Sequence, residues 1–140
     1  MQNTGQLTEA LSAKALKFME TGYQKELTYK REDGSFSAFG NSDAAGSTWL
    51  TAFVARSFRQ AQPYIAIEDR VIDDALRWLS ANQAANGSFP EVGKVSHADM
   101  QGGSAKGIPL TAYVLLAFLE NRVSSNSCKM LNCSLTKYVN

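Results

Sequence analysis

The sequence lacks long apolar runs, an excess of either charge, and most of the short motifs that mark catalytic or cofactor sites. No stretch of about 18 or more apolar residues occurs, so no transmembrane helix is expected. Fourteen Lys and Arg residues face thirteen Asp and Glu residues, which argues against a nucleic-acid or polybasic membrane partner. Gly-x-Ser-x-Gly, Cys-x-x-Cys and phosphate-binding glycine loops are absent too, so neither a cofactor nor a metal is expected.

Cysteine is also scarce, with only Cys128 and Cys133 near the C-terminus. Their separation does not place them neatly on one helical face. We interpret them as unrelated thiols or as partners for cysteines outside this chain, because a metal site would need more ligands. Asn86-Gly87-Ser88 and Asn132-Cys133-Ser134 match the glycosylation acceptor pattern, which permits an extracellular location without establishing it.

The chain contains an internal repeat. Asp33-Gly34-Ser35-Phe36 recurs as Asn86-Gly87-Ser88-Phe89, and Leu50–Val54 recurs as Leu110–Val114 with the pattern Leu-Thr-Ala-aromatic-Val. A segment of helical periodicity precedes each turn sequence. The repeat unit is therefore helix, turn, loop, helix. Two such hairpins cannot close a core alone, so neighbouring hairpins are expected outside this chain.

Apolar periodicity predicts four helices and an all-α fold, with weak strand signals throughout. The stripes are Leu7, Leu11, Ala15, Phe18 and Met19; Trp49, Phe53 and Val54; Val71, Ile72, Ala75, Leu76 and Leu79; and a fourth helix over about 109–121. The expected N-cap is Thr8 for the first helix and Ser47 or Thr48 for the second. Glu68 and Asp69 are expected in the first turn of the third helix. Pro109 is expected as the first residue of the fourth, where its missing N–H has no partner anyway.

The Asp-Gly and Asn-Gly dipeptides predict tight turns, because Gly34 and Gly87 can adopt positive φ without a Cβ clash. Phe36 and Phe89, which follow them, are predicted to anchor each loop to the helices. Each loop joins the first helix of a hairpin to the second, so both loops are expected at the same end of the molecule. That end is the expected location of function.

His97, the only histidine, lies in the long second loop, 84–107. An imidazole can act as a nucleophile or a general base near neutral pH. Asp99, two residues on, is a candidate to orient the ring, whereas Gly102-Gly103 lacks the sequence context of a phosphate loop. On these residues alone, a solvated loop histidine is the plainer interpretation and catalysis is the alternative.

Many blocks of the sequence resemble the alpha-2-macroglobulin and complement component three superfamily. They are Thr21–Gln24, Tyr29-Lys30, Asp33–Phe36, Thr48–Val54, Ile65–Ile67, Ala75–Leu79, His97–Gly103 and Leu110–Val114. The likeness runs in order from about Leu11 to Glu120 and fades from Asn121 on. It implies a partial thioester-type domain over 1–120 and a tail over 121–140, which either starts a further hairpin or is disordered.

The resemblance implies an α/α toroid, a ring of helical hairpins of which this chain holds about two. It also implies a secreted innate-immune parent, an opsonin or a protease trap, that attaches covalently to targets by acyl transfer. The implied partners are other domains of the parent, together with microbial-surface hydroxyls or target proteases. In this family the thioester joins the Cys and Gln of a Gly-Cys-Gly-Glu-Gln motif that lies upstream of the matched region.

In family members with a histidine at the position of His97, that histidine attacks the thioester first. It forms an acyl-imidazole, and the freed thiolate acts as base for an incoming hydroxyl. The resemblance therefore implies a catalytic role for His97 in the parent. The loop and turn residues expected to support it are Asp33, Gly34, Phe36, Gly87, Phe89, Asp99, Gly102 and Gly103.

This chain departs from the family pattern because Gly-Cys-Gly-Glu-Gln is absent. We therefore expect no acyl transfer from the chain itself, which is not expected to be an enzyme. The first residues lack the basic head and apolar core of a signal peptide, so the extracellular location rests on the resemblance. Two alternatives stay open. One is an α/α-barrel enzyme of the terpene cyclase or prenyltransferase type, whose Asp clusters are missing because Asp73-Asp74 lacks a third acid. The other is a helical interaction module without chemistry.

Overall fold

The computed structural model describes residues 9–121, which form an all-α fold as predicted. The elements are α1 (Glu9–Leu27), η2 (Gly40–Ser42), α2 (Thr48–Ala61), α3 (Asp69–Ala81), η3 (Ala98–Ser104) and α4 (Gly107–Glu120), where η denotes a 3-10 helix. Within residues 9–121 the only β-type pairing is an isolated bridge between Lys30 and Phe36. Leu7, Thr8, Asn132 and both cysteines lie outside the described residues.

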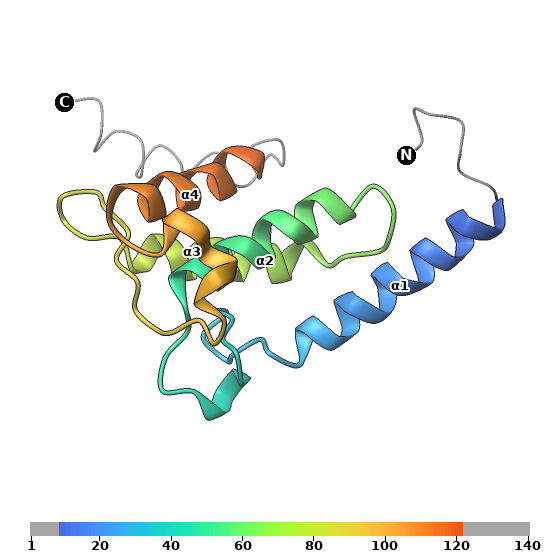
Figure 1. The fold of residues 1–140 in the computed structure, drawn as a ribbon, viewed down its shortest axis with the longest axis horizontal. Helices are drawn as coiled ribbons and strands as arrows, with labels where there is room; N and C mark the ends of the chain where they lie inside the picture. Colours follow the sequence, from blue (N-terminus) through green and yellow to red (C-terminus); the bar gives the residue numbers. More distant parts are fainter. Residues whose placement is uncertain (1–8, 122–140) are drawn as a thin grey trace.

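Along the chain the α-helices follow the predicted helix–loop–helix order, α1–α2 and then α3–α4, which we call the first and the second hairpin, although the packing between helices is made by α2, α3 and α4. Figure 1 shows α2 beside α3 and α4, with α1 extending away from this group. The loop between α1 and α2 and the loop between α3 and α4 both lie at the end of the molecule where α2 and α4 begin, which confirms their predicted common location. Closure of such hairpins into a ring needs further hairpins, so the toroid stays a prediction.

The core lies between α2, α3 and α4 and contains the predicted stripe of α3. All five stripe residues of that helix are buried, namely Val71, Ile72, Ala75, Leu76 and Leu79. In α2, Trp49 and Val54 are buried, while Phe53 is partly exposed and stacks on Trp49 with ring centroids 5.3 Å apart. Helical periodicity thus located the core correctly wherever another helix covers the stripe.

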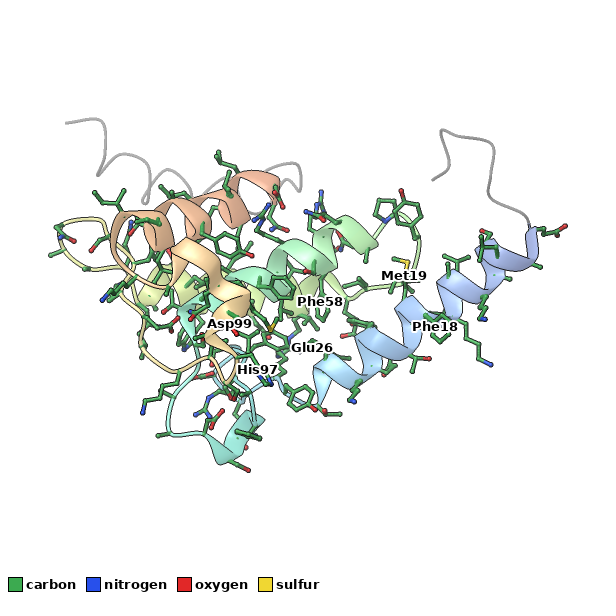
Figure 2. The ribbon with its side chains drawn as sticks, viewed as in Figure 1. Phe18, Met19, Glu26, Phe58, His97 and Asp99 are labelled. Atoms are coloured by element: carbon green, nitrogen blue, oxygen red, sulfur yellow. The ribbon has the colours of Figure 1, made fainter. Side chains whose placement is uncertain are left out.

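The apolar stripe of α1 is an exception, because most of it is not buried. Tyr23, near the C-terminal end, is the only buried residue of α1 and packs edge-on against Phe58 at 5.0 Å. Phe18 is 67% exposed on the part of α1 that extends away from the other helices (Figure 2). Leu11 is also exposed. The periodicity predicted the helix correctly, and Met19 packs against the core, but Phe18 and Leu11 of the same stripe remain exposed.

Helix α4 is apolar on its inner and outer faces. It buries Leu110, Val114 and Phe118, whereas Ile108 is 85% exposed, and Leu116 and Leu119 are exposed as well. No single helix within residues 9–121 has the length and hydropathy to cross a bilayer; only η3 and α4 taken together, with a 96° bend between them, satisfy both criteria.

The repeated turns are built in the same way. Gly34 and Gly87 have φ of 91° and 86°, as the turn dipeptides predicted. The Asp33 carboxylate accepts hydrogen bonds from the backbone N–H and hydroxyl of Ser35, and the Asn86 carbonyl oxygen accepts the same pair from Ser88. These side chains close Asx-type turns.

Each turn is then joined to the helix that follows it. The buried N–H of Phe36 donates to the Thr51 hydroxyl of α2 over 3.0 Å, and that of Phe89 donates to the Thr111 hydroxyl of α4 over 3.0 Å. Both phenylalanine rings are buried, and they contact Phe58 and Phe118 at corresponding positions of the two helices. The sequence repeat therefore reflects a repeated set of hydrogen bonds and ring contacts.

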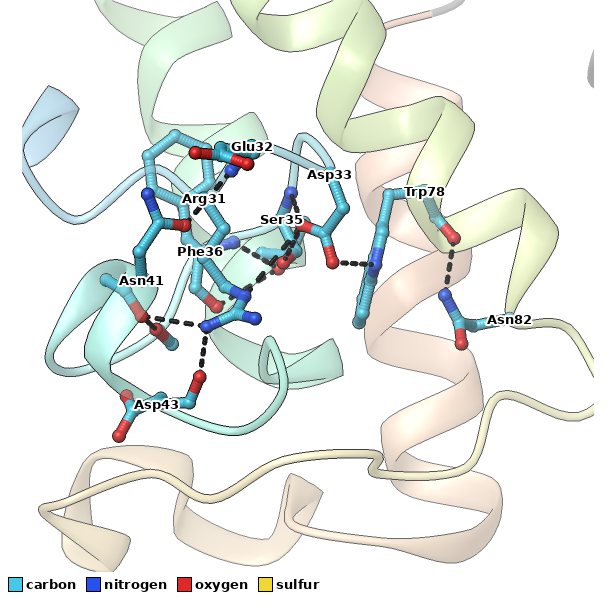
Figure 3. Close-up of polar contacts among 12 residues, drawn as sticks. Arg31, Glu32, Asp33, Ser35, Phe36, Asn41, Asp43, Trp78 and Asn82 are labelled. Atoms are coloured by element: carbon cyan, nitrogen blue, oxygen red, sulfur yellow. Dashed lines mark hydrogen bonds and ion pairs between the residues drawn. The ribbon is translucent and has the colours of Figure 1, made fainter.

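Polar contacts hold the first loop against α3 (Figure 3). The second oxygen of Asp33 accepts a hydrogen bond from the Trp78 indole N–H at 3.1 Å. Arg31 donates to the backbone carbonyls of Gly40 and Asp43, which closes the loop. Burial alone would raise the pKa of Asp33, but hydrogen bonds from Ser35, the Arg31 charge and Trp78 outweigh it and lower that pKa. Asp33 thus connects the two hairpins as an ionised side chain.

The helix ends agree with the sequence except at α3 and α4. Ser47 is the N-cap of α2, where its hydroxyl accepts from the Leu50 N–H. Glu68 is the N-cap residue of α3, without a side-chain cap bond, rather than a member of its first turn. Helix α4 starts at Gly107, so the prediction that Pro109 is its first residue was wrong. Pro109 still costs the helix no hydrogen bond, because the first four N–H groups of a helix have no partner within it.

Candidate functional site

The second loop approaches the N-terminus of α2, where a single carboxylate attaches it. Glu91 accepts hydrogen bonds from the backbone N–H groups of Thr48 and Trp49, over 2.6 and 3.1 Å, and from the Ser47 hydroxyl over 3.2 Å. A carboxylate suits this position because the first N–H groups of a helix are unpaired and carry the positive end of its dipole. Glu91 therefore joins the loop of the second hairpin to the first hairpin.

Close backbone contact reinforces this attachment. A Cβ added to Gly93 would lie only 2.6 Å from the carbonyl oxygen of Gly46 in the first loop. The Thr48 hydroxyl donates to the Pro90 carbonyl over 2.7 Å. The two loops therefore touch each other, and Gly93 leaves the room that this contact requires.

A second attachment holds the far side of the histidine loop. The Trp49 indole N–H donates to the Ser104 hydroxyl at 2.9 Å, and Ser104 in turn donates to the Gln101 carbonyl at 2.6 Å. Gln101 is the buried residue of η3. Both ends of the segment that carries His97 are thus fixed on α2, at Glu91 and at Ser104.

His97 is the N-cap residue of η3, and its side chain is exposed. Its carbonyl accepts a backbone hydrogen bond from Met100 over 3.1 Å. Within the described residues, no hydrogen bond or ion pair joins the ring to Asp99, which is itself exposed; Figure 2 shows both residues in this region. The loop therefore fixes the backbone of His97 and leaves the imidazole accessible.

The two glycines of this loop differ in what they require. Gly102 has φ 52° and ψ −130°, a conformation that residues with a Cβ rarely adopt. A Cβ on Gly103 would meet nothing within 4 Å. The conformational requirement for glycine thus lies at Gly102, where the chain turns within η3.

A cavity of about 290 Å³ adjoins His97. Its lining comes from the C-terminal end of α1, the first loop, α2 and the histidine loop: Glu26, Tyr29, Ser37, Ala38, Phe39, Leu50, Val95, Ser96, His97 and Met100. Most of the wall is apolar. Burial raises the pKa of the Glu26 carboxyl, the one acidic group in this lining.

The sequence indicated His97 but did not indicate Glu26, Glu91 or Ser104. Glu26 lies in the first hairpin, and Glu91 contacts residues in a different hairpin. No local periodicity or short motif indicates that residues so far apart in the sequence meet in the fold. Within residues 9–121, no three or more His, Cys, Asp or Glu side chains lie close enough together to hold a metal ion.

Comparison with known proteins identifies the relatives of this fold. The family model described as "A-macroglobulin TED domain" matches residues 1–139. The chain belongs to this alpha-2-macroglobulin thioester-domain family. Ovostatin of Gallus gallus is 42% identical over 120 residues, which cover 86% of this chain. The chain spans about 8% of the length of that relative.

Membership of the family confirms the resemblance drawn from the repeated blocks and the histidine loop. It decides against the alternative of a terpene cyclase or prenyltransferase. The residues belong to a thioester-type domain, and the histidine loop with its two attachments to α2 is the candidate functional site within it.

Proposed function

We propose that the parent protein attaches covalently to targets outside the cell, and that His97 carries the acyl group during this attachment. The Cys and Gln of the thioester would come from another part of the parent, because Gly-Cys-Gly-Glu-Gln is absent from this chain. The observation that supports the proposal best is the accessible His97 ring on a segment attached to α2 at both ends. Such a ring can meet a donor on a neighbouring hairpin and an acceptor from solvent.

The proposed chemistry has two steps. A neutral imidazole nitrogen attacks the thioester carbonyl, the C–S bond breaks, and the thiolate leaves. A hydroxyl then attacks the acyl-imidazole, the thiolate takes its proton, and the C–N bond breaks to leave an ester on the target. The first step needs a ring nitrogen with a free lone pair. This fits the finding that no carboxylate within residues 9–121 pairs with the His97 ring.

The proposed targets are hydroxyl groups of microbial surfaces, for an opsonin, or target proteases, for a protease trap. In both cases the role is in innate immunity, and the other domains of the parent are the nearest partners. Helices α1 and α4 both expose large apolar side chains, Phe18 on α1 and Ile108, Leu116 and Leu119 on α4, and packing against such domains would cover them. Interaction through these faces is therefore a second function, compatible with the first.

Replacement of His97 by Asn in the full-length parent tests the proposal. After activation, ester formation with glycerol should fall by about 10²–10⁴-fold, the usual effect of losing a positioned catalytic group. Amide formation with methylamine should fall much less, and the melting temperature should barely change because the ring is exposed. The matched control is Lys94→Ala, a change at another exposed side chain of the same loop.

Equal losses towards both nucleophiles, together with a large drop in melting temperature, would show that His97 has a structural role instead. The 140-residue chain alone should form no stoichiometric adduct with methylamine, as measured by mass spectrometry, because it lacks the thioester motif.

A further inference from the structure

The cavity beside His97 combines apolar walls with one acidic group. Phe39, Leu50, Val95 and Met100 supply much of the wall, while Glu26 and His97 supply charged or titratable groups. Its volume of about 290 Å³ lies at the small end of the range for ligand pockets. The space suits a short aliphatic chain that ends in a polar group.

The Glu26 side chain is half-buried. Within the described residues it accepts no hydrogen bond and forms no ion pair. A carboxylate in this setting has lost part of its hydration without gaining a partner, which is costly unless a cation or donor arrives. Burial accordingly raises the pKa of this carboxyl. The chemistry that would satisfy Glu26 is a positively charged donor that enters through the cavity.

We propose that the cavity is a subsite for a primary alkylammonium group, such as the end of a lysine side chain. The ammonium group pairs with Glu26, and the methylene groups lie against Phe39, Leu50 and Met100. Lysine suits both parts because it carries three donors on a four-carbon apolar stem. An alcohol of the same length would fill the cavity but leave the Glu26 charge uncompensated.

Occupancy of this subsite brings the amine of a target protein beside His97. To accept an acyl group, the bound ammonium group must first give a proton to Glu26, which frees the lone pair of its nitrogen. This use rests on the proposed function, whereas binding of the ammonium group does not. The inference makes Glu26 the residue that selects ammonium groups over neutral alcohols for binding in this cavity, whereas hydroxyl groups that reach the acylated His97 from solvent do not depend on it.

The test is a nuclear magnetic resonance titration of the full 140-residue chain, labelled with ¹³C at histidine Cε1. His97 is the only histidine, so it gives the single reporter signal. n-Butylammonium should shift this signal saturably and bind about tenfold or more tightly than n-butanol, the effect of one charge-assisted hydrogen bond. n-Butyrate, which has the same charge as Glu26, should cause no saturable shift.

Glu26→Gln should reduce the affinity for n-butylammonium to that for n-butanol. Glu20→Gln is the matched control, because Glu20 is an exposed carboxylate of the same helix that does not line the cavity. The inference is overturned by any of three outcomes: no saturable shift, equal binding of n-butanol to the unmodified chain, or full n-butylammonium binding by Glu26→Gln. The comparison of the two ligands needs no variant, so it holds even if Glu26→Gln changes the fold. Acyl transfer by the parent is measured separately with His97→Asn, so either result can fail alone.

Discussion

The attachment of the second loop to α2 through Glu91 makes a quantitative prediction about stability. The perturbation is Glu91→Ala, which removes the acceptor for the backbone N–H groups of Thr48 and Trp49. Both residues are almost fully buried, with 0% and 3% exposure, so water cannot readily replace the lost carboxylate. The Ser47 hydroxyl and the Gly93 N–H lose the same partner.

The expected cost follows from these contacts. A buried N–H left without a partner costs about 1–3 kcal/mol, and loss of a negative charge at a helix N-terminus costs about 0.3–1 kcal/mol. Local relaxation would let some water reach the freed groups, so we expect a total of about 2–4 kcal/mol. This is a large fraction of the roughly 5–15 kcal/mol that stabilises a typical domain.

Urea unfolding followed by circular dichroism measures this cost directly. The matched control is Glu68→Ala, because Glu68 is the N-cap residue of α3 but makes no side-chain cap bond. That change should cost about 0.5 kcal/mol or less, as for other exposed sites. If both variants lose the same stability, the cost at Glu91 would be only a helix-dipole effect, and the argument from buried N–H groups would be refuted.

Much of the fold follows from local sequence patterns. The stripe of α3 was predicted residue by residue, because a helix buried on one face needs apolar residues at a 3.6-residue period. The turns at Gly34 and Gly87 were predicted because glycine is favoured at positive φ. Both features depend only on residues within a few positions of each other.

Contacts between the hairpins could not be predicted in this way. Glu91 meets Thr48, and Asp33 meets Trp78, across separations of 43 and 45 residues with no shared periodicity. The exposure of Phe18 also depends on what lies beside α1 rather than on the helix itself. Sequence patterns indicate which face of a helix is apolar, but a neighbouring element decides whether that face is covered.

The candidate site shows the same division. His97 was found because it is a single histidine in a recognisable loop, while the cavity that it shares with Glu26 depends on how two loops pack on α2. The repeat gives both turns the same internal bonds. Within residues 9–121, however, Asp33 alone of the two turn residues also accepts a hydrogen bond from α3, through an oxygen whose place in Asn86 is taken by the amide nitrogen. This difference in one side chain adds a hydrogen bond between the first loop and the second hairpin.

Two further predictions concern a buried hydrogen bond of the core and the partly exposed ion pair between Arg56 and Glu120. Thr51→Val keeps the side-chain shape but leaves the buried N–H of Phe36 without its acceptor, so it should cost about 1–3 kcal/mol in urea unfolding; a loss no larger than that of Thr21→Val, at an exposed threonine, would contradict this account. The second prediction is a pH dependence at Glu120, whose pKa is lowered by hydrogen bonds from Arg56 despite burial. Because the folded-state pKa lies below the ordinary 4.5, the pair stabilises the fold above that pH, and this contribution is lost as the pH falls through the folded-state value. Glu120→Gln should therefore cost about 0.5–1 kcal/mol at pH 7 and less at pH 3, because below pH 4.5 the unfolded chain takes up a proton that the folded chain takes up only at lower pH. Unfolding free energies of both proteins at the two pH values decide the matter, since a difference that persists unchanged in acid would have to come from packing rather than from charge.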